Sequence, residues 1–198
     1  KKIMTFGLVI ISFSNIILVS APTYLILLLA HIPAGIGWGS SGPIGGIHAQ
    51  LIERHSGKII SPYYAMGFNI GIFIGGILAG FILGNTMNPT FVFLILFFLS
   101  IIVSLIIYMN GLPKDLDFKG EGEKLKIPEK NVLIFGFLLF VIFGSNGIII
   151  DWSALWFTKE LNAPLYLASL GLICLSFGGI FANLFSNQLI NLFSEKIV

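Results

Sequence analysis

FVFLILFFLSIIVSLIIYM, residues 91–109, contains no charged side chain and is apolar nearly all round. About 20 helical residues cross a hydrocarbon core of about 30 Å, and backbone in lipid must satisfy its own hydrogen bonds, so this stretch is predicted to be a transmembrane helix. Five more apolar stretches are long enough to do the same: 3–20, 22–50, 63–84, 132–157 and 165–192. The sequence therefore predicts an all-α polytopic membrane protein with six transmembrane helices.

Composition agrees with this fold class. Of the 198 residues, 56% are hydrophobic and 10% are charged, which leaves too little polar surface for a soluble domain of this length. The net charge of +2 says little about partners; we expect membrane lipid around the apolar stretches and no nucleic-acid partner. Cys174 is the single cysteine, which excludes a disulfide framework and a cysteine metal site. We expect no cofactor and no metal.

Cationic residues predict the orientation of the chain. Threading the six stretches back and forth through a bilayer puts all eleven Lys and Arg residues except Lys159 on one side. That side holds Lys1, Lys2, Arg54, Lys58, Lys114, Lys119, Lys124, Lys126, Lys130 and Lys196. Basic residues near helix ends are retained in the cytosol. We therefore expect a multi-pass protein of the cell or inner membrane with both ends of the chain cytoplasmic.

The charged segment 111–131 divides the chain. It carries five Lys against five acidic residues, together with prolines and glycines, and is predicted to be a cytoplasmic linker. It separates four helices in 1–110 from two helices in 132–198. Lys2-Ile3-Met4 resembles Lys196-Ile197-Val198 six crossings later, which is what two parallel six-helix halves would give. We expect the chain to be the middle of a longer protein.

The second apolar stretch contains Leu27-Leu28-Leu29-Ala30-His31-Ile32-Pro33-Ala34-Gly35-Ile36-Gly37. It resembles the fourth helix of the major facilitator superfamily, in which an Arg four residues after a Leu precedes a Gly-x-Gly signature. His31 stands where that Arg would be, and a neutral imidazole avoids the insertion penalty of a fixed charge. His31 is thus a candidate for binding protons or substrate, or else a core histidine bonded to a neighbouring helix. Gly35 and Gly37 are predicted to pack against another helix.

The third stretch carries Gly67, Asn69, Gly71, Gly75 and Gly76 at spacings that form two glycine ridges. Such small-residue ridges are typical of tight helix packing, which is the role expected of Gly71, Gly75 and Gly76. The run also resembles the fifth-helix signature of facilitator antiporters, in which Gly-Pro precedes Gly-Gly. Ile72 occupies the Pro position, so a symporter or uniporter remains open beside the antiporter.

The fifth stretch holds the only carboxylate that adjoins a long apolar core, Asp151, in the run Asp151-Trp152-Ser153-Ala154. About 28 Å of helix precedes it, which places it toward the outer interface. Residues 144–147, Gly-Ser-Asn-Gly, are expected to break the helix in mid-membrane beside a substrate path. Together with the earlier matches, this segment resembles the fucose-permease-like branch of the superfamily.

Two other classes of function are weighed against transport. Gly39-Ser40-Ser41-Gly42 resembles the motif of rhomboid-type intramembrane serine proteases, but all three histidines lie in or just after the same helix, and His31 is about 15 Å from Ser41 along it. The run is more typical of a helix-packing face. His48, Glu53 and His55 lack the spacing of helical metal ligands. A passive membrane subunit would not need the polar residues of the second and fifth stretches.

The resemblance implies a major facilitator fold, with these six helices being the third to eighth of twelve. It implies a secondary active transporter, not an enzyme, which moves a small solute such as a sugar by alternating access. His31, Asn69, Asn146 and Asp151 are the expected substrate- or proton-binding residues, with a proton or sodium as coupling ion. A proton-coupled drug or metabolite efflux antiporter is the alternative.

Overall fold

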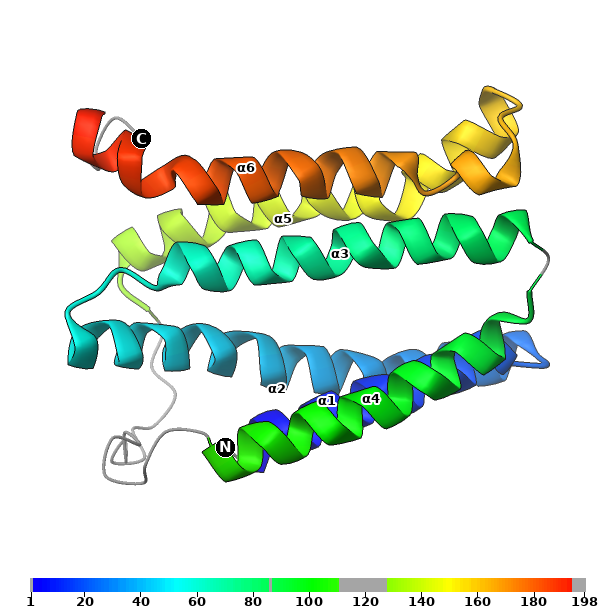
Figure 1. Ribbon diagram of the computed structural model, residues 1–198, viewed down its shortest axis with the longest axis horizontal. Helices are drawn as coiled ribbons and strands as arrows, with labels where there is room; N and C mark the ends of the chain where they lie inside the picture. The colour runs from blue at the N-terminus through cyan, green and yellow to red at the C-terminus, as the bar shows by residue number, and fades with distance from the viewer. Residues whose placement is uncertain (1, 86, 111–127, 194–198) are drawn as a thin grey trace. The chain divides into compact units, whose positions relative to one another are not determined.

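The computed structural model describes residues 2–85, 87–110 and 128–193. Six long helices run through this part of the chain (Figure 1). Their bounds are α1 Lys2–Ser20, α2 Tyr24–Ser56, α3 Ser61–Gly84, α4 Pro89–Asn110, α5 Lys130–Leu155 and α6 Leu170–Phe193. All six are long and apolar enough to cross a membrane, which confirms the prediction of an all-α fold with six spans.

Helix α2 is the longest, at 33 residues, and extends past the predicted end at residue 50. It begins after Thr23, whose hydroxyl accepts a hydrogen bond from the Ile26 N–H, and it ends at Gly57 in the left-handed region with φ of 65°. The last two turns are polar because they carry Glu53, Arg54 and His55. Apolar patterning alone could not find them, since they continue the helix beyond the hydrophobic segment.

Contacts divide the chain into two compact units. The first contains α1, α2, the start of α3 to Tyr64, and α4. Small residues bring α1 and α2 together: a Cβ at Gly37 would lie 2.8 Å from the Gly7 carbonyl oxygen and 2.6 Å from Ile11 Cγ1. Helix α4 packs on α1, where the Phe13 and Phe97 ring centroids are 6.2 Å apart. Dispersion between closely packed backbones, not apolar burial, holds such helices together in lipid.

The second unit contains α3 from Ala65, with α5 and α6. Helix α3 meets α6 at Gly76, where a Cβ would lie 2.9 Å from Ile173 Cγ1. At Gly80 it meets the short helical turn Leu165–Leu167 that precedes α6, where a Cβ would lie 2.8 Å from the Tyr166 carbonyl oxygen. Contacts thus group α3 with α5 and α6. The predicted domains, 1–110, 111–131 and 132–198, refer to the two bundles of a twelve-helix protein, and they stay a prediction. Most of the predicted linker, residues 111–127, lies outside the described part of the chain.

Helix α5 runs without interruption through residues 144–147, where a break was expected. The Ser145 hydroxyl donates to the Val141 carbonyl oxygen at 2.8 Å, so this polar residue is satisfied within its own helix. The irregularity occurs later, in a π-helical turn over Trp156–Glu160 that the Leu161 N–H closes on the Trp156 carbonyl oxygen at 3.2 Å. The prediction of a break at residues 144–147 was therefore wrong. The helix becomes irregular only at the end of the span, not in its middle.

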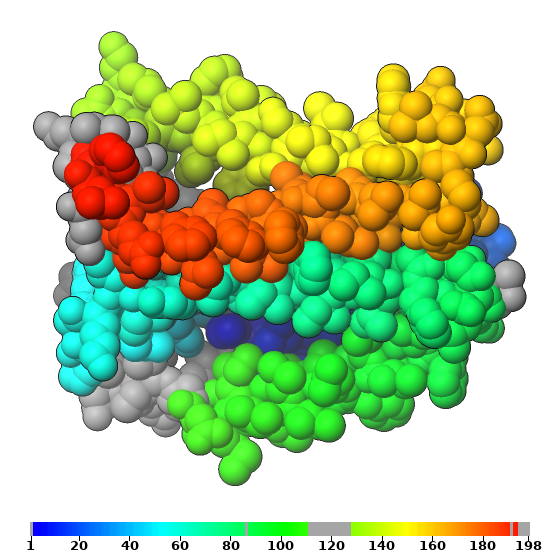
Figure 2. Space-filling view, turned by 45° about the horizontal axis from the view of Figure 1, so that its top comes forward, coloured from blue at the N-terminus to red at the C-terminus, as the bar shows by residue number. Residues whose placement is uncertain are grey.

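The surface of α5 is apolar. Four of its phenylalanines are about two-thirds exposed, at 67%, 65%, 71% and 68% for Phe135, Phe137, Phe140 and Phe143. Figure 2 shows α5, in yellow-green and yellow, with much of its length on the visible surface. A soluble protein would not leave so many rings in water, so these side chains belong in lipid or against further helices.

Candidate functional site

His31 lies near the start of α2 on an exposed face. Its Nδ1 is 2.7 Å from the Leu27 carbonyl oxygen, one turn earlier. A carbonyl can only accept, so Nδ1 carries the hydrogen and Nε2 is left to accept a hydrogen bond or bind a proton. Within the described residues no partner of Nε2 occurs. The alternative role, a core histidine bonded to a neighbouring helix, finds no support in these contacts.

The face of α2 that carries His31 is lined by glycines. At spacings of three and four residues from His31 come Gly35, Gly39, Gly42 and Gly46, and no described atom lies within 4 Å of where a Cβ would stand on any of them. This surface, called the open α2 face below, combines a histidine and bare backbone at membrane depth.

The other side of α2 carries its buried small residues, which are Ala30, Ala34, Gly37, Ser41, Gly45 and Ala49. Gly37 and Ser41 meet Gly7 of α1, whereas Gly45 lies against Tyr64 of α3. Of the two glycines predicted to pack, Gly37 lies in the contact with α1 and Gly35 lies on the open α2 face. The Ser41 hydroxyl donates to the Gly37 carbonyl oxygen at 2.8 Å, within its own helix. The serine that resembled a protease nucleophile is thus used in local helix bonding.

Asn69 is half-buried on the side of α3 that faces α6. Its Nδ2 donates to the Ala65 carbonyl oxygen at 3.0 Å, and its Oδ1 is so close to α6 that a Cβ at Gly179 would lie 2.5 Å from it. Gly76 shares this side. Gly71 and Gly75 lie on the opposite ridge, where no described atom comes within 4 Å of the position that an added Cβ would occupy. One predicted ridge therefore packs, and the other is open among the described residues.

Asn146 and Asp151 both lie on α5, five residues apart and hence on different sides of the helix. Asn146 is half-buried and Asp151 is exposed, one turn before the π-helical turn. Trp152 and Trp156 beside it are each 62% exposed, as expected of aromatic residues at a membrane interface. Such π-helical turns occur often at functional sites.

The structure places the four candidate residues in separate parts of the fold. His31 belongs to the first unit, whereas Asn69, Asn146 and Asp151 belong to the second. Within the second unit, no described hydrogen bond joins any two of the three. Their roles in binding substrate or protons, and the packing roles of the glycines, stay predictions.

Sequence reasoning missed a polar stripe along α6. Ser169, Ser176 and Asn183 recur every seven residues and so share one side of the helix. Ser176 is 1% exposed and donates to the Leu172 carbonyl oxygen at 2.7 Å, while the buried Ser169 hydroxyl has no partner in the described chain. The seven-residue spacing was a signal that could have found this stripe.

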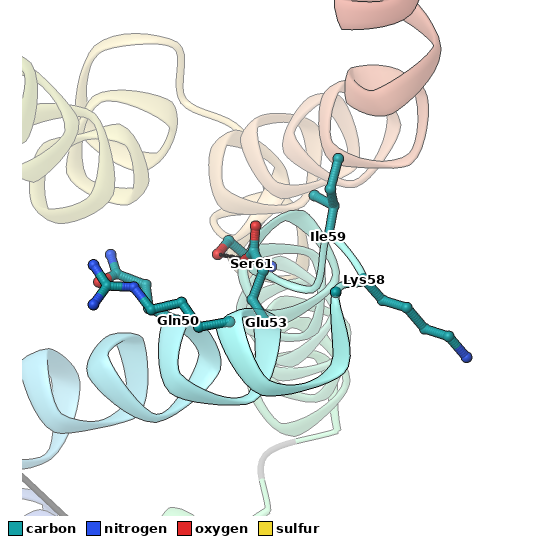
Figure 3. Close-up of a pocket in the computed structure, with 7 residues that line it drawn as sticks. Gln50, Glu53, Lys58, Ile59 and Ser61 are labelled. Atoms are coloured by element: carbon teal, nitrogen blue, oxygen red, sulfur yellow. Dashed lines mark hydrogen bonds between the residues drawn. The ribbon is translucent and has the colours of Figure 1, made fainter. Parts of the chain in front are cut away.

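Glu53 has a role that its sequence context did not indicate. Its Oε2 accepts hydrogen bonds from the Ser61 hydroxyl at 2.5 Å and the Ser61 N–H at 3.2 Å (Figure 3). It also accepts one from the Ile60 N–H at 3.4 Å. The Ser61 bonds lower the pKa of Glu53, which lies beyond the apolar part of α2. This carboxylate caps the start of α3 from the end of α2. In the described ranges, no group of three His, Cys, Asp or Glu residues could hold a metal.

Comparison with known proteins adds one result. The sequence model of the Major Facilitator Superfamily matches residues 1–197, nearly the whole chain. No curated protein and no solved structure matches. The family match agrees with the six apolar helices. The chain therefore belongs to the Major Facilitator Superfamily, whose members are multi-pass membrane proteins that act as secondary transporters and are generally not enzymes.

Proposed function

We propose that the protein moves a small polar solute, a sugar or a similar compound, across the membrane by alternating access. In this proposal its helices are the third to eighth of twelve, both ends of the chain are cytoplasmic, and two bundles rock about a site near the bilayer midplane. The segment around Asp151 supports a place in the fucose-permease-like branch. The coupling ion is a proton or sodium.

The open α2 face is the observation that carries the proposal. Polar groups in lipid are disfavoured unless they face protein or a water-filled cavity. His31 presents Nε2 on this face beside Gly35 and Gly39, where no described atom lies within 4 Å of an added Cβ. The acceptor nitrogen of His31 can bind a hydroxyl group of a hydroxyl-rich solute.

The remaining candidates have different parts in this proposal. Asn146 and Asp151 lie on the same helix at different depths and would contact solute along its path. Asn69 faces Gly179 of α6, so it would act where these two helices meet. His31 would bind the proton in a proton-coupled mechanism, since its Nε2 can accept a proton and has no partner among the described residues.

Uptake of radiolabelled monosaccharides, fucose among them, by cells that express the complete gene tests the proposal. We expect the His31→Ala variant to lose uptake and the pH dependence of uptake. His55→Ala is the matched control, because His55 is exposed beyond the apolar part of α2 and should leave both unchanged. Unchanged uptake by the His31 variant at every pH would remove His31 from the site.

The alternative is a proton-coupled efflux antiporter of drugs or metabolites, which the glycine run of α3 favours. Helix α3 continues through Ile72 without a break, as the absence of the signature Pro would predict. Vesicles with an imposed proton gradient distinguish the two. A symporter dissipates the gradient when solute is supplied on the proton-rich side, and an antiporter does so when solute is supplied on the proton-poor side. Solute accumulation along the proton gradient would contradict the antiporter.

A further inference from the structure

An open hollow of about 560 Å³ lies where α2 ends and α3 begins. Its lining consists of Gln50, Glu53, Arg54, Gly57, Lys58, Ile59 and Ser61 (Figure 3). All of these belong to the first compact unit. The hollow is distant from His31, because Gln50 lies about five helical turns beyond it along α2.

The charges in this hollow do not cancel one another. Glu53 is its single acid, and the carboxylate is already engaged by the Ile60 and Ser61 N–H groups and the Ser61 hydroxyl. No described residue forms an ion pair with Arg54 or Lys58. The hollow therefore presents two cations without an ion-pair partner among the described residues, beside a carboxylate that caps α3.

Arg54 and Gln50 lie one turn apart on the same side of α2. A guanidinium offers a planar pair of donors that matches two phosphate oxygens, and the Gln50 amide can donate to a third. Lys58 points away from Gln50 (Figure 3), so it adds positive charge without sharing the same oxygens in this arrangement. The chemistry of the lining therefore fits a phosphate ester.

The depth of the hollow identifies the source of such a phosphate. The hydrophobic segment of α2 ends at Gln50, and the next residues to re-enter the apolar region include Ile59, Tyr63 and Tyr64, which are 49%, 54% and 43% exposed. Tyrosines with one polar end mark the membrane–water interface, and basic pockets at helix ends bind lipid headgroups there. Phospholipid phosphates occupy this same layer.

We propose that Arg54 and Gln50, with Lys58 supplying additional charge, bind the headgroup phosphate of an anionic phospholipid at the α2–α3 connection. Each basic residue near an anionic membrane surface strengthens binding about fivefold. Loss of both cations should therefore weaken binding about 25-fold. This site depends on the chain spanning a membrane but not on which solute it transports.

Native mass spectrometry of the complete protein in detergent tests the proposal, with dioleoylphosphatidylglycerol as the probe and dioleoylphosphatidylcholine as the neutral lipid. We expect wild type to retain phosphatidylglycerol preferentially. Arg54→Gln should lose affinity about fivefold and the double variant with Lys58→Gln about 25-fold. Arg54→Lys keeps the charge but not the planar fork, so it should lose less than Arg54→Gln and also serves if the latter misfolds.

Lys159→Gln is the matched control, because it removes one exposed cation from the π-helical turn that follows α5, outside the hollow. Phosphatidylglycerol binding that is unchanged in Arg54→Gln, or equally reduced in Lys159→Gln, would overturn the proposal. Equal wild-type binding of the two lipids would overturn it as well. Displacement of the lipid by millimolar inorganic phosphate would overturn the lipid as ligand and indicate a site for free phosphate.

Discussion

Replacing Gly37 by Ala should weaken the contact between α1 and α2. The added methyl would lie 2.8 Å from the Gly7 carbonyl oxygen, 3.1 Å from the Ile11 nitrogen and 2.6 Å from Ile11 Cγ1. Ordinary contact begins near 3.4 Å, so the backbones must move apart by about 0.6 Å, the difference between 3.4 and 2.8. A rotamer change of Ile11 cannot relieve this, because two of the three atoms belong to the backbone.

Gly35→Ala is the control that isolates this effect. Gly35 lies two residues away in the same helix, and no described atom is within 4 Å of where its methyl would stand. Both substitutions gain the same helix propensity, about 1 kcal/mol in favour of Ala, so that gain cancels in the comparison. The remaining term is overpacking, which costs about 1–3 kcal/mol. Gly37→Ala should therefore be less stable than Gly35→Ala by that amount.

The free energies of unfolding can be obtained from SDS titrations of the purified complete protein, followed by far-UV circular dichroism. Both variants and wild type are measured at one detergent composition, because the reference state depends on it. Equal stability of the two variants would refute the close approach of α1 and α2 at Gly37. A larger loss in Gly35→Ala would indicate that a helix outside the described part packs on the open α2 face.

Three further substitutions test other contacts. Glu53→Gln should weaken the capping of α3. Because folding lowers the pKa of Glu53, the stability that its carboxylate contributes is present above the ordinary carboxyl pKa of 4.5 and is lost as pH falls through the pKa of the folded state. The melting temperatures of wild type and variant should therefore converge in acid. Gly57→Ala should destabilise by about 1 kcal/mol, since φ is 65° at this helix end, and SDS titration would detect it. Gly76→Ala should lower the melting temperature more than Gly75→Ala, whose added methyl meets nothing described within 4 Å; equal values would contradict packing of α3 on α6.

The spans could be predicted from sequence because lipid imposes a simple requirement. Runs such as residues 91–109 leave the backbone no partner except itself, so length and apolarity alone predict a helix. The same reasoning failed at residues 144–147, where glycines and polar side chains indicated a break. Instead, the Ser145 hydroxyl donates to the Val141 carbonyl oxygen within the same helix. Composition alone does not reveal that a polar side chain finds its hydrogen-bond partner in its own helix.

The candidate site was harder to predict than the fold. Helical spacing separates the two glycine ridges of α3, but it cannot say which ridge meets a neighbour. The ridge with Gly76 meets α6, whereas a Cβ added at Gly71 or Gly75 would meet no described atom of another element within 4 Å. The cap on Ser61 comes from Glu53, eight residues earlier and on another helix. Such a pairing depends on the turn between the helices, which has no periodic pattern to read.

The length of α2 has a mechanical consequence. Thirty-three residues make a rod of about 50 Å, and even a strong tilt cannot fit all of it into a hydrocarbon layer of about 30 Å. Its final turns therefore act as a lever arm outside the lipid, about 25 Å from the rod's midpoint. A swing of about 10° would sweep that tip through about 4 Å, farther than a hydrogen bond can stretch. The bond from Ser61 to Glu53 would then either drag the first turn of α3 along or break.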